Sequence, residues 1–245
     1  MGDNMDKTKA ISFKKVNKYY NDFHALKNIS FDIPKNSIVG LIGANGSGKT
    51  TMIKCLLNYY DDFSGEINVF GKNKGILQGD DTFAYIPDTP VYYEELTVSE
   101  HFDFISRMYK TEEKVGRFIE DFELESHLNK FPHELSKGNR QKLLIGCALL
   151  RDYKILVSDE PFSGLDPRQL NNLRQKFLEL RNDGKTIILS THLLSLIENL
   201  CDYYIMIDKG KLIGVGRIEE ILEKTPDCKS LEDLYLYLSE DGDKN

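Results

Sequence analysis

A glycine-rich segment with one lysine is the first part of the chain whose residue types could do chemistry. It follows the uninterrupted apolar run at residues 38–42 and consists of Gly43, Ala44, Asn45, Gly46, Ser47, Gly48, Lys49 and Thr50. Glycines let the backbone curl so that successive N–H groups converge on an anion, and a helix that begins there adds partial positive charge. The spacing G-x-x-x-x-G-K-[ST] after a strand is typical of a phosphate-binding loop.

The side chains that close this loop suit a nucleoside triphosphate. We expect Lys49 to reach the β- and γ-phosphates, Thr50 to coordinate Mg²⁺, and Thr51 to support the same phosphates. A glycine-rich turn matches the pattern by accident on the order of once in a hundred chains of this length. Because strand, loop and helix signals agree at this point, we reject the accidental match.

Two adjacent carboxylates end another buried strand. Asp159 and Glu160 follow the apolar residues 155–157, and ligands bind at the carboxyl edge of a parallel sheet. We expect Asp159 to hold Mg²⁺, directly or through water, and Glu160 to polarise the water that attacks the γ-phosphate. A strand capped by solvated acids is the alternative, and it fits less well once a phosphate loop precedes the pair.

The elements that must position these residues follow from periodicity. We predict strands at residues 11–16, 26–33, 38–42, 65–70, 82–86, 155–157 and 186–189, and a terminal hairpin at 203–207 and 211–215. We predict helices that begin near residue 49 and at a capping box at 97–100, and others at 112–122, 137–150, 168–181, 193–200, 218–223 and 231–238. Strands that alternate with helices indicate right-handed parallel crossovers.

The predicted fold class is therefore α/β: a P-loop NTPase parallel-sheet core with an N-terminal antiparallel β section and an inserted helical lobe. We expect a single domain in which residues 11–88 and 151–225 form the nucleotide-binding core. Residues 89–150 would form the helical lobe, and residues 226–245 a C-terminal tail helix.

The composition of the chain limits the kinds of partner and site that we expect. The 245 residues carry a net charge of −7, which argues against a broad nucleic-acid-binding face, so no nucleic acid is expected. The four cysteines form no C-x-x-C pair, so neither a zinc site nor a disulfide framework is indicated, and a reducing cytoplasm is the simplest location. No apolar run approaches the roughly 18 residues that span a bilayer, so a membrane role would come through a partner.

Taken together, the motifs resemble those of an ATP-binding-cassette (ABC) nucleotide-binding domain over residues 11–215. The family's signature, usually L-S-G-G-Q, corresponds to Leu135-Ser136-Lys137-Gly138-Asn139, in which Lys137 and Asn139 depart from the commonest form. The resemblance implies that Ser136 and Gly138 bind the γ-phosphate of an ATP held by the opposite subunit of a head-to-tail dimer. By itself, this segment is a serine N-cap that opens a helix.

Other positions acquire roles from the same resemblance. Asp166 corresponds to the D-loop and would contact the partner subunit, although Asp166-Pro167 is also a good helix start. His192 corresponds to the switch histidine, which contacts the γ-phosphate and helps hold the attacking water. Tyr20 corresponds to the aromatic residue that stacks on adenine. Tyr19 is the second choice, and either tyrosine could belong to the core.

One position departs from the family pattern. Asp88 stands where the Q-loop normally has a glutamine that touches Mg²⁺ and couples to the membrane subunit. An aspartate can still bind Mg²⁺ directly or through water, and its charge would alter metal affinity and coupling. The segments 85–90 and 94–97, together with the ending Leu-Glu-Asp-Leu-Tyr at 231–235, resemble the Ecs-type bacterial exporter ATPases.

The resemblance implies an ATP-binding and ATP-hydrolysing subunit of an ABC transporter, with ATP and Mg²⁺ as cofactors. It would dimerise with an identical or different nucleotide-binding subunit around two ATP molecules. It would then drive separate transmembrane permease subunits from the inner face of the cell membrane. One alternative is a soluble ABC-type ATPase acting in assembly, repair or translation. Another is a P-loop kinase, which would not need Ser136 and His192. A non-catalytic regulatory module would be expected to lose Lys49 or Glu160.

Overall fold

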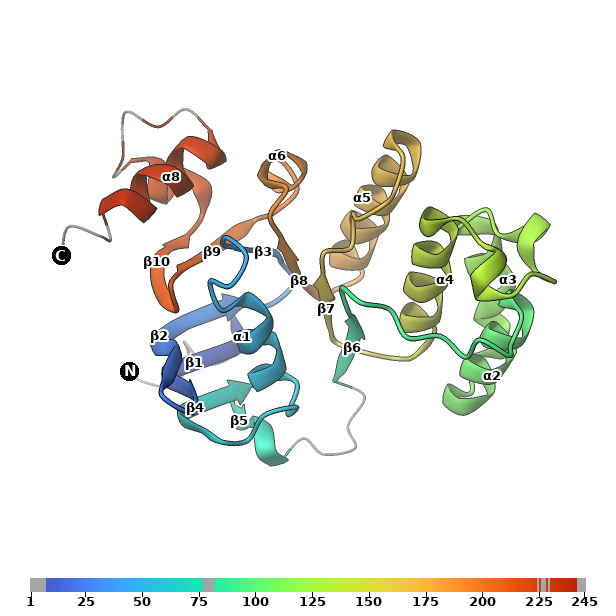
Figure 1. The fold of residues 1–245 in the computed structure, drawn as a ribbon, viewed down its shortest axis with the longest axis horizontal. Helices are drawn as coiled ribbons and strands as arrows, with labels where there is room; N and C mark the ends of the chain where they lie inside the picture. Colours follow the sequence, from blue (N-terminus) through green and yellow to red (C-terminus); the bar gives the residue numbers. More distant parts are fainter. Residues whose placement is uncertain (1–7, 77–81, 224, 226–227, 229, 242–245) are drawn as a thin grey trace. The chain divides into compact units, whose positions relative to one another are not determined.

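The computed structural model describes residues 8–76, 82–223, 225, 228 and 230–241. Contacts divide the chain into two units, one formed by residues 1–80 and 177–245, the other by residues 81–176. Each unit has its own strands and helices (Figure 1). The boundary at residue 176 falls within a helix, α5 (Pro167–Asn182). The domain boundaries predicted at residues 89, 150 and 226 stay predictions.

An antiparallel sheet opens the first unit, as predicted. Its strand order is β2-β1-β4-β5, with bounds β1 (Lys9–Tyr20), β2 (Phe23–Pro34), β4 (Phe63–Val69) and β5 (Lys72–Asn73). β1 and β2 form a hairpin whose register ends at Tyr20↔Phe23. The rings of Phe13 and Phe31 stack across the pair at 4.6 Å. The short β5 and the 3₁₀ turn η2 (Lys74–Ile76) lie between the predicted strands 65–70 and 82–86, where no strand or helix was predicted.

The parallel strands of the first unit are the ones that carry the glycine-rich loop. They are β3 (Ile38–Ile42), β8 (Thr186–Thr191) and β9 (Tyr203–Asp208), and β10 (Lys211–Gly216) joins them in the order β10-β9-β3-β8. β3 is parallel to both β8 and β9, and β10 returns antiparallel to β9 as the predicted hairpin. Every residue of β3 and β8 is buried, as expected for strands covered on both faces.

Helix α1 (Lys49–Leu56) joins the two sheets of this unit (Figure 1). Its apolar side chains share one small internal cavity with side chains from both sheets. The lining residues are Met52, Ile53 and Leu56 of α1, Phe13, Phe31 and Ile33 of the antiparallel sheet, and Leu41, Ile188 and Ile205 of the parallel strands. The hydrophobic core therefore lies directly beneath the helix that follows the loop.

The C-terminal part of the first unit contains α6 (Leu194–Ile197), α7 (Ile218–Leu222) and α8 (Leu231–Asp241). The prediction of a helix over residues 193–200 was wrong in length. The Tyr204 hydroxyl donates to the carbonyl oxygens of Ile197 at 2.9 Å and Glu198 at 2.7 Å. The N–H groups of Leu200 and Cys201 also donate to the Ile197 carbonyl, and residues 198–200 form a turn rather than a further part of the α-helix.

The second unit contains a strand pair and a group of helices. β6 (Phe83–Ile86) is parallel to β7 (Ile155–Asp159). Between them in the chain come α2 (Val98–Tyr109), α3 (Val115–Asp121) and α4 (Lys137–Leu150), with 3₁₀ turns η3 (Glu112–Lys114), η4 (Glu125–His127) and η5 (Pro132–Glu134). The predicted helix at 112–122 therefore begins as a 3₁₀ turn.

The three α-helices between β6 and β7 pack on one another (Figure 1). Phe102 of α2 is fully buried, and a Cβ atom at Gly146 of α4 would lie 2.9 Å from its ring. The absence of a side chain at Gly146 thus lets α2 and α4 approach closely. The predictions of an α/β fold, an N-terminal antiparallel section and helices between β6 and β7 are confirmed.

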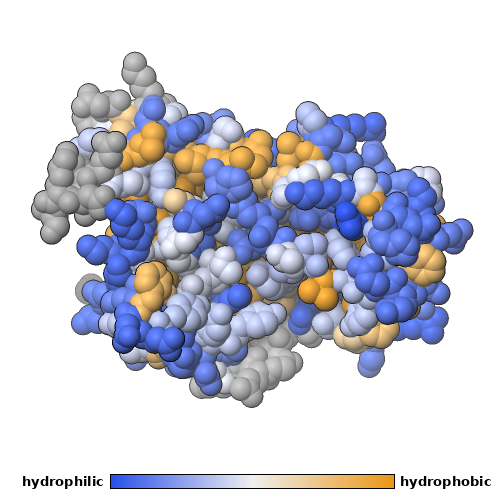
Figure 2. Space-filling view, viewed as in Figure 1, coloured by the Kyte–Doolittle hydropathy of each residue, from blue (hydrophilic) through white to orange (hydrophobic). Residues whose placement is uncertain are grey.

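Hydrophilic residues cover most of the face seen in Figure 2, and hydrophobic residues form separate patches on it. Across the described ranges, no helix combines the length and apolarity required to cross a bilayer.

The start of α2 offers a test of local stability. The Thr97 hydroxyl accepts from the Glu100 N–H at 3.3 Å, and the Glu100 carboxylate accepts from the Thr97 N–H at 2.7 Å. We predict that Thr97→Ala lowers the free energy of unfolding by about 1 kcal/mol, because the cap oxygen is lost. Thr97→Ser keeps that oxygen and should be nearly neutral. Urea unfolding followed by circular dichroism measures both variants, and equal losses would contradict the capping role.

Candidate phosphate-binding site

The glycine-rich loop connects β3 to α1. Gly46 has φ 79° and Gly48, at the N-cap of α1, has φ 117°. Both values lie in the left-handed region that only glycine adopts at low cost. Left-handed residues between right-handed ones are what an anion-binding concavity of backbone N–H groups requires. The sequence thus dictates a backbone suited to phosphate at the N-terminus of α1.

Lys49 folds back over this loop. Its side chain is only 7% exposed, and its Nζ donates to the carbonyl oxygens of Gly43 at 2.6 Å and Ala44 at 3.2 Å. Phosphate oxygens are charged and accept stronger hydrogen bonds than neutral carbonyls do. The ammonium group is therefore held next to the loop in a position where an anion can compete for it. The buried hydroxyl of Ser47 makes no hydrogen bond within the described part of the chain.

The loop is supported from beneath by β9 and the turn after it. A Cβ atom at Gly43 would lie 2.5 Å from the Ile207 carbonyl oxygen and 2.3 Å from the Ser47 hydroxyl, so no side chain fits there. The Gly210 N–H donates to the Ser47 carbonyl at 2.9 Å. The Ala44 N–H also donates to the Tyr235 hydroxyl of α8 at 2.8 Å, a contact that sequence reasoning missed.

Tyr20 lies beside the first turn of α1. Its hydroxyl is 3.3 Å from the Thr51 hydroxyl, and its ring meets that of Tyr60 edge-on at 5.7 Å. Burial raises the pKa of Tyr20 to about 12, so the phenol is neutral at neutral pH. Tyr19 instead stacks on the His24 ring at 4.0 Å. The structure therefore brings Tyr20 next to the loop helix, with about a third of the side chain still exposed.

His192 leaves the same edge of the parallel strands as the loop. β3 and β8 pair in parallel with Ile42 opposite Thr191, so Gly43 and His192 are the next residues of their strands. His192 is exposed at this point. The register of the sheet, rather than sequence proximity, brings the histidine to the loop.

The second unit collects its carboxylates in the same way. Ile86 pairs with Ser158 in the parallel ladder of β6 and β7. Asp159 and Glu160 follow Ser158, and Asp88 follows Ile86 by two residues. Asp159 is 3% exposed, whereas Asp88 belongs to the exposed residues. All three predicted acids therefore leave one edge of this strand pair.

Glu160 adopts an unusual backbone conformation. Its φ of 50° places a non-glycine residue in the left-handed region, which costs about 1–3 kcal/mol and is concentrated at functional sites. The side chain is half-buried. The chain turns directly after β7, and the Ser163 N–H donates to the Glu160 carbonyl at 3.2 Å.

The signature segment (residues 135–139) and the D-loop segment (residues 163–166) contact each other within the second unit. The Ser136 hydroxyl accepts from the Asn139 N–H at 3.2 Å and caps α4, as the helix-start interpretation predicted. A Cβ atom at Gly138 would lie 3.1 Å from the Gly164 carbonyl oxygen. Lys137 donates to the Ser163 hydroxyl at 3.0 Å, which gives this departure from the usual signature a packing role.

Asp166 is placed as a helix cap. Its carboxylate accepts from the Gln169 N–H at 2.9 Å, and the Gln169 side chain accepts from the Asp166 N–H at 3.3 Å. Gln141 of α4 donates to the Pro161 carbonyl at 3.3 Å, a second link between the signature helix and the segment after β7 that sequence reasoning missed.

Comparison with known proteins decides the family. Residues 26–163 match the ABC transporter family. The chain is 36% identical to the ABC-type transporter ATP-binding protein EcsA of Bacillus subtilis over 243 residues, which are 94% of this chain and 97% of that protein. This chain belongs to the ABC transporter family.

Other relatives agree. The Nod factor export ATP-binding protein I of Rhizobium etli is 32% identical, covering 91% of this chain and 73% of that protein. The solved structure of an ATP-binding subunit of an ABC transporter superposes with a TM-score of 0.86 at 33% identity, covering 94% of this chain and 99% of that one. A nucleotide-free ATP-binding cassette superposes with a TM-score of 0.79 at 25% identity, covering 92% and 98%.

The chain is therefore an ATP-binding and ATP-hydrolysing subunit of the ABC transporter family, and its core is the predicted P-loop NTPase sheet. The resemblance to Ecs-type ATPases inferred from the sequence is confirmed.

The residues predicted to hold Mg²⁺ suit that ion chemically. Thr50, Asp88 and Asp159 all offer oxygen ligands, which Mg²⁺ prefers. Among the described residues, no group of three or more His, Cys, Asp or Glu side chains could hold a metal by itself.

Two glycine-to-alanine variants test the packing of the loop in this ABC ATPase. We predict that Gly43→Ala destabilises the fold by about 1–3 kcal/mol, because its methyl group overlaps the Ile207 carbonyl. ATP affinity should fall about tenfold or more as the loop is displaced. Gly116→Ala in α3 is the control, since a Cβ atom there meets nothing within 4 Å. Thermal unfolding and a binding titration measure both, and wild-type affinity in Gly43→Ala would contradict this packing.

Proposed function

We propose that this ABC ATPase works as a pair of subunits, identical or different, around two ATP molecules. Each ATP would lie between the phosphate loop of one subunit and Ser136 and Gly138 of the other. The pair would drive separate transmembrane permease subunits. The observation that carries the proposal is the buried Lys49, whose Nζ is held 2.6 Å from the Gly43 carbonyl above a glycine backbone suited to phosphate.

Binding would begin with an exchange of partners at Lys49. The γ- and β-phosphates would attract the ammonium away from the Gly43 and Ala44 carbonyls, because a charged acceptor is the stronger one. Backbone N–H groups of the loop and the N-terminus of α1 would hold the same phosphates. The Tyr20 ring, fixed by its hydroxyl contact with Thr51, would stack on adenine.

Hydrolysis would depend on groups at the strand edges. Glu160 would accept a proton from the attacking water as the water oxygen bonds to the γ-phosphorus and the bond from that phosphorus to the β-phosphate oxygen breaks, which releases ADP and phosphate. His192 would help hold the water. Mg²⁺, when bound through Thr50, Asp159 and Asp88, would neutralise charge on the phosphate oxygens. The position of Glu160 directly after the buried Asp159, at the end of β7, supports its assignment as the catalytic carboxylate.

Closure of the pair would be the working step. The Ser136 hydroxyl and the N-terminus of α4 would bind the partner's γ-phosphate, and Asp166 would contact the partner beside them. Contacts of Lys137 and Gly138 with the D-loop support a joint movement of these two segments. Loss of the γ-phosphate removes the attraction that favours the closed pair, so hydrolysis resets the cycle.

The segment after Asp88 is the proposed meeting point with the permease. Exposed apolar side chains gather in and after it: Val91 is 86% exposed and Tyr93 52%, and the Tyr93 ring lies 5.2 Å from that of Phe104. Isolated apolar side chains at a protein surface are ordinary, but a group of them favours a partner. Through this contact the protein would be held at the inner face of the cell membrane.

No observation favours the alternative of an ABC-type ATPase acting in assembly, repair or translation. A non-catalytic module is not supported either, because Lys49 and Glu160 are both present.

The role of Glu160 has a direct test. We predict that Glu160→Gln retains ATP affinity but lowers the hydrolysis rate by about 10²- to 10⁴-fold, because the amide cannot accept the proton. Glu125→Gln, which removes the same charge from an exposed turn of the same unit, is the control and should hydrolyse ATP normally. Phosphate release and nucleotide binding are the measurements. A Glu160→Gln variant that keeps its hydrolysis rate would refute the assignment.

A further inference from the structure

The C-terminal helix α8 contacts the phosphate loop directly. The Tyr235 hydroxyl accepts the Ala44 N–H at 2.8 Å, although the two residues are 191 positions apart in the chain. Ala44 is the second residue of the loop and its side chain is exposed. Tyr235 belongs to the Leu-Glu-Asp-Leu-Tyr segment at residues 231–235. This segment has no role in ATP binding and hydrolysis as proposed above.

Hydrogen bonds restrain the peptide groups on both sides of Ala44. Its carbonyl accepts from the Ser47 N–H at 3.1 Å and from Lys49 Nζ at 3.2 Å. When phosphate attracts Lys49 away from this carbonyl, one of these restraints is lost. The Tyr235 hydrogen bond does not involve Lys49, so it can hold the start of the loop while the lysine changes partners.

Tyr235 is itself held on a well-anchored stretch of α8. Leu231 and Leu234 are almost fully buried, and the Leu231 N–H donates to the Glu198 carboxylate at 2.8 Å. Glu198 follows α6, the helix directly after His192. The first turns of α8 therefore connect the phosphate loop with the segment that carries the predicted switch histidine.

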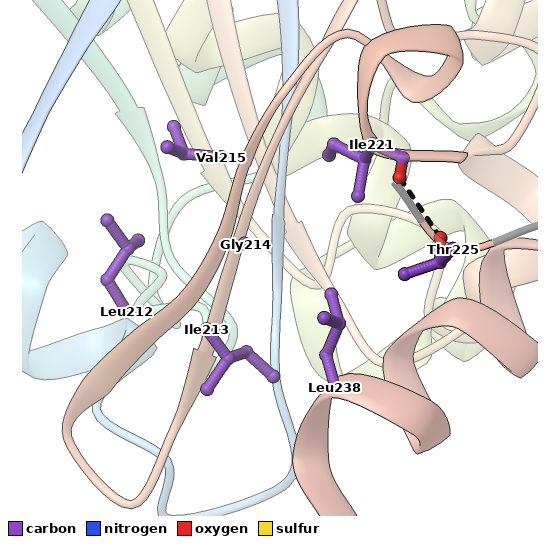
Figure 3. A pocket seen from close by; sticks show the side chains of 7 residues that line it. All are labelled: Leu212, Ile213, Gly214, Val215, Ile221, Thr225 and Leu238. Atoms are coloured by element: carbon purple, nitrogen blue, oxygen red, sulfur yellow. Dashed lines mark hydrogen bonds between the residues drawn. The ribbon is translucent and has the colours of Figure 1, made fainter. Parts of the chain in front are cut away.

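The far end of α8 is packed less completely. Leu238 faces a hollow of about 320 Å³, which β10 and α7 also line through Ile213, Gly214 and Ile221 (Figure 3). A Cβ atom at Gly214 would lie 3.1 Å from Leu238, so the helix approaches β10 closely there. Contacts of Leu231 and Leu234 before Tyr235, and of Leu238 after it, therefore hold the part of α8 to which Tyr235 belongs.

We propose that Tyr235 is a positioning residue for ATP: its hydroxyl fixes the first peptide of the phosphate loop, which makes α8 part of the nucleotide site. This inference rests on the proposed function, because it assumes that the loop holds ATP. Tyr235 does not touch the phosphates. It acts through Ala44 on the N–H groups that do.

Tyr235→Phe tests this role by removing one oxygen atom. The ring, the buried leucines and the Glu198 contact remain, so α8 keeps its position. The Kd of a fluorescent ATP analogue and the KM for ATP should each rise about two- to tenfold, the factor that one neutral hydrogen bond supplies. The value of kcat should change little, because the groups that act on the water and the γ-phosphate are untouched.

Tyr237→Phe is the matched control, since it removes a hydroxyl from the same helix but leaves the Ala44 hydrogen bond in place. It should keep wild-type Kd and KM. Hydrogen exchange adds a second readout: ATP should slow amide exchange in the peptide covering residues 231–239 of the wild-type protein, and less so in Tyr235→Phe.

The outcomes separate the two proposals. Wild-type Kd, KM and exchange in Tyr235→Phe would overturn the positioning role, and so would an equal weakening in Tyr237→Phe, which would indicate general loosening of α8. A wild-type protein that fails to bind ATP at all would instead overturn the proposed function of the loop.

Discussion

Phosphate recognition by backbone N–H groups is the constraint on which the rest of this structure depends. A peptide N–H cannot be redirected by a rotamer change, so the loop binds an anion only if its whole backbone is held in one conformation. Left-handed Gly46 and Gly48 provide that conformation, and the absence of a side chain at Gly43 lets it lie against the Ile207 carbonyl. The hydrophobic core beneath α1 fixes the helix end from which the loop projects.

The pairing of the parallel strands then determines which side chains lie at the same sheet edge as the phosphate loop and which lie at the same edge as the carboxylates. Pairing of Ile42 with Thr191 brings Gly43 and His192 to one edge, and pairing of Ile86 with Ser158 does the same for Asp88 and Asp159. A slip of one residue in either ladder would turn these side chains to the opposite face. Fully buried strands such as β3 and β8 resist such a slip, because their apolar side chains have fixed places in the core.

Much of this could be predicted from the sequence, because the decisive signals are local. The loop spacing, the apolar runs of β3 and β7, and the helix from Lys137 to Leu150 depend on neighbouring residues, and the structure places each as predicted. The short length of α6 could not be predicted. The helix ends where the hydroxyl of Tyr204, a residue of the later strand β9, donates to the carbonyl oxygens of Ile197 and Glu198. Tyr235 was missed for the same reason: its partner is brought to it only by the tertiary fold.

Complementation between two inactive variants shows whether each ATP is shared by two subunits. Lys49→Ala removes the phosphate-binding lysine, and Ser136→Asp keeps the cap of α4 but adds a negative charge where the partner's γ-phosphate would lie. ATP hydrolysis is measured for each variant alone and for their mixture. If two copies of this chain share each ATP, both variants alone are inactive and their mixture regains activity, because a mixed pair has one site formed by an intact loop and an intact signature. A mixture no more active than its components would show that two copies of this chain do not share ATP in this way.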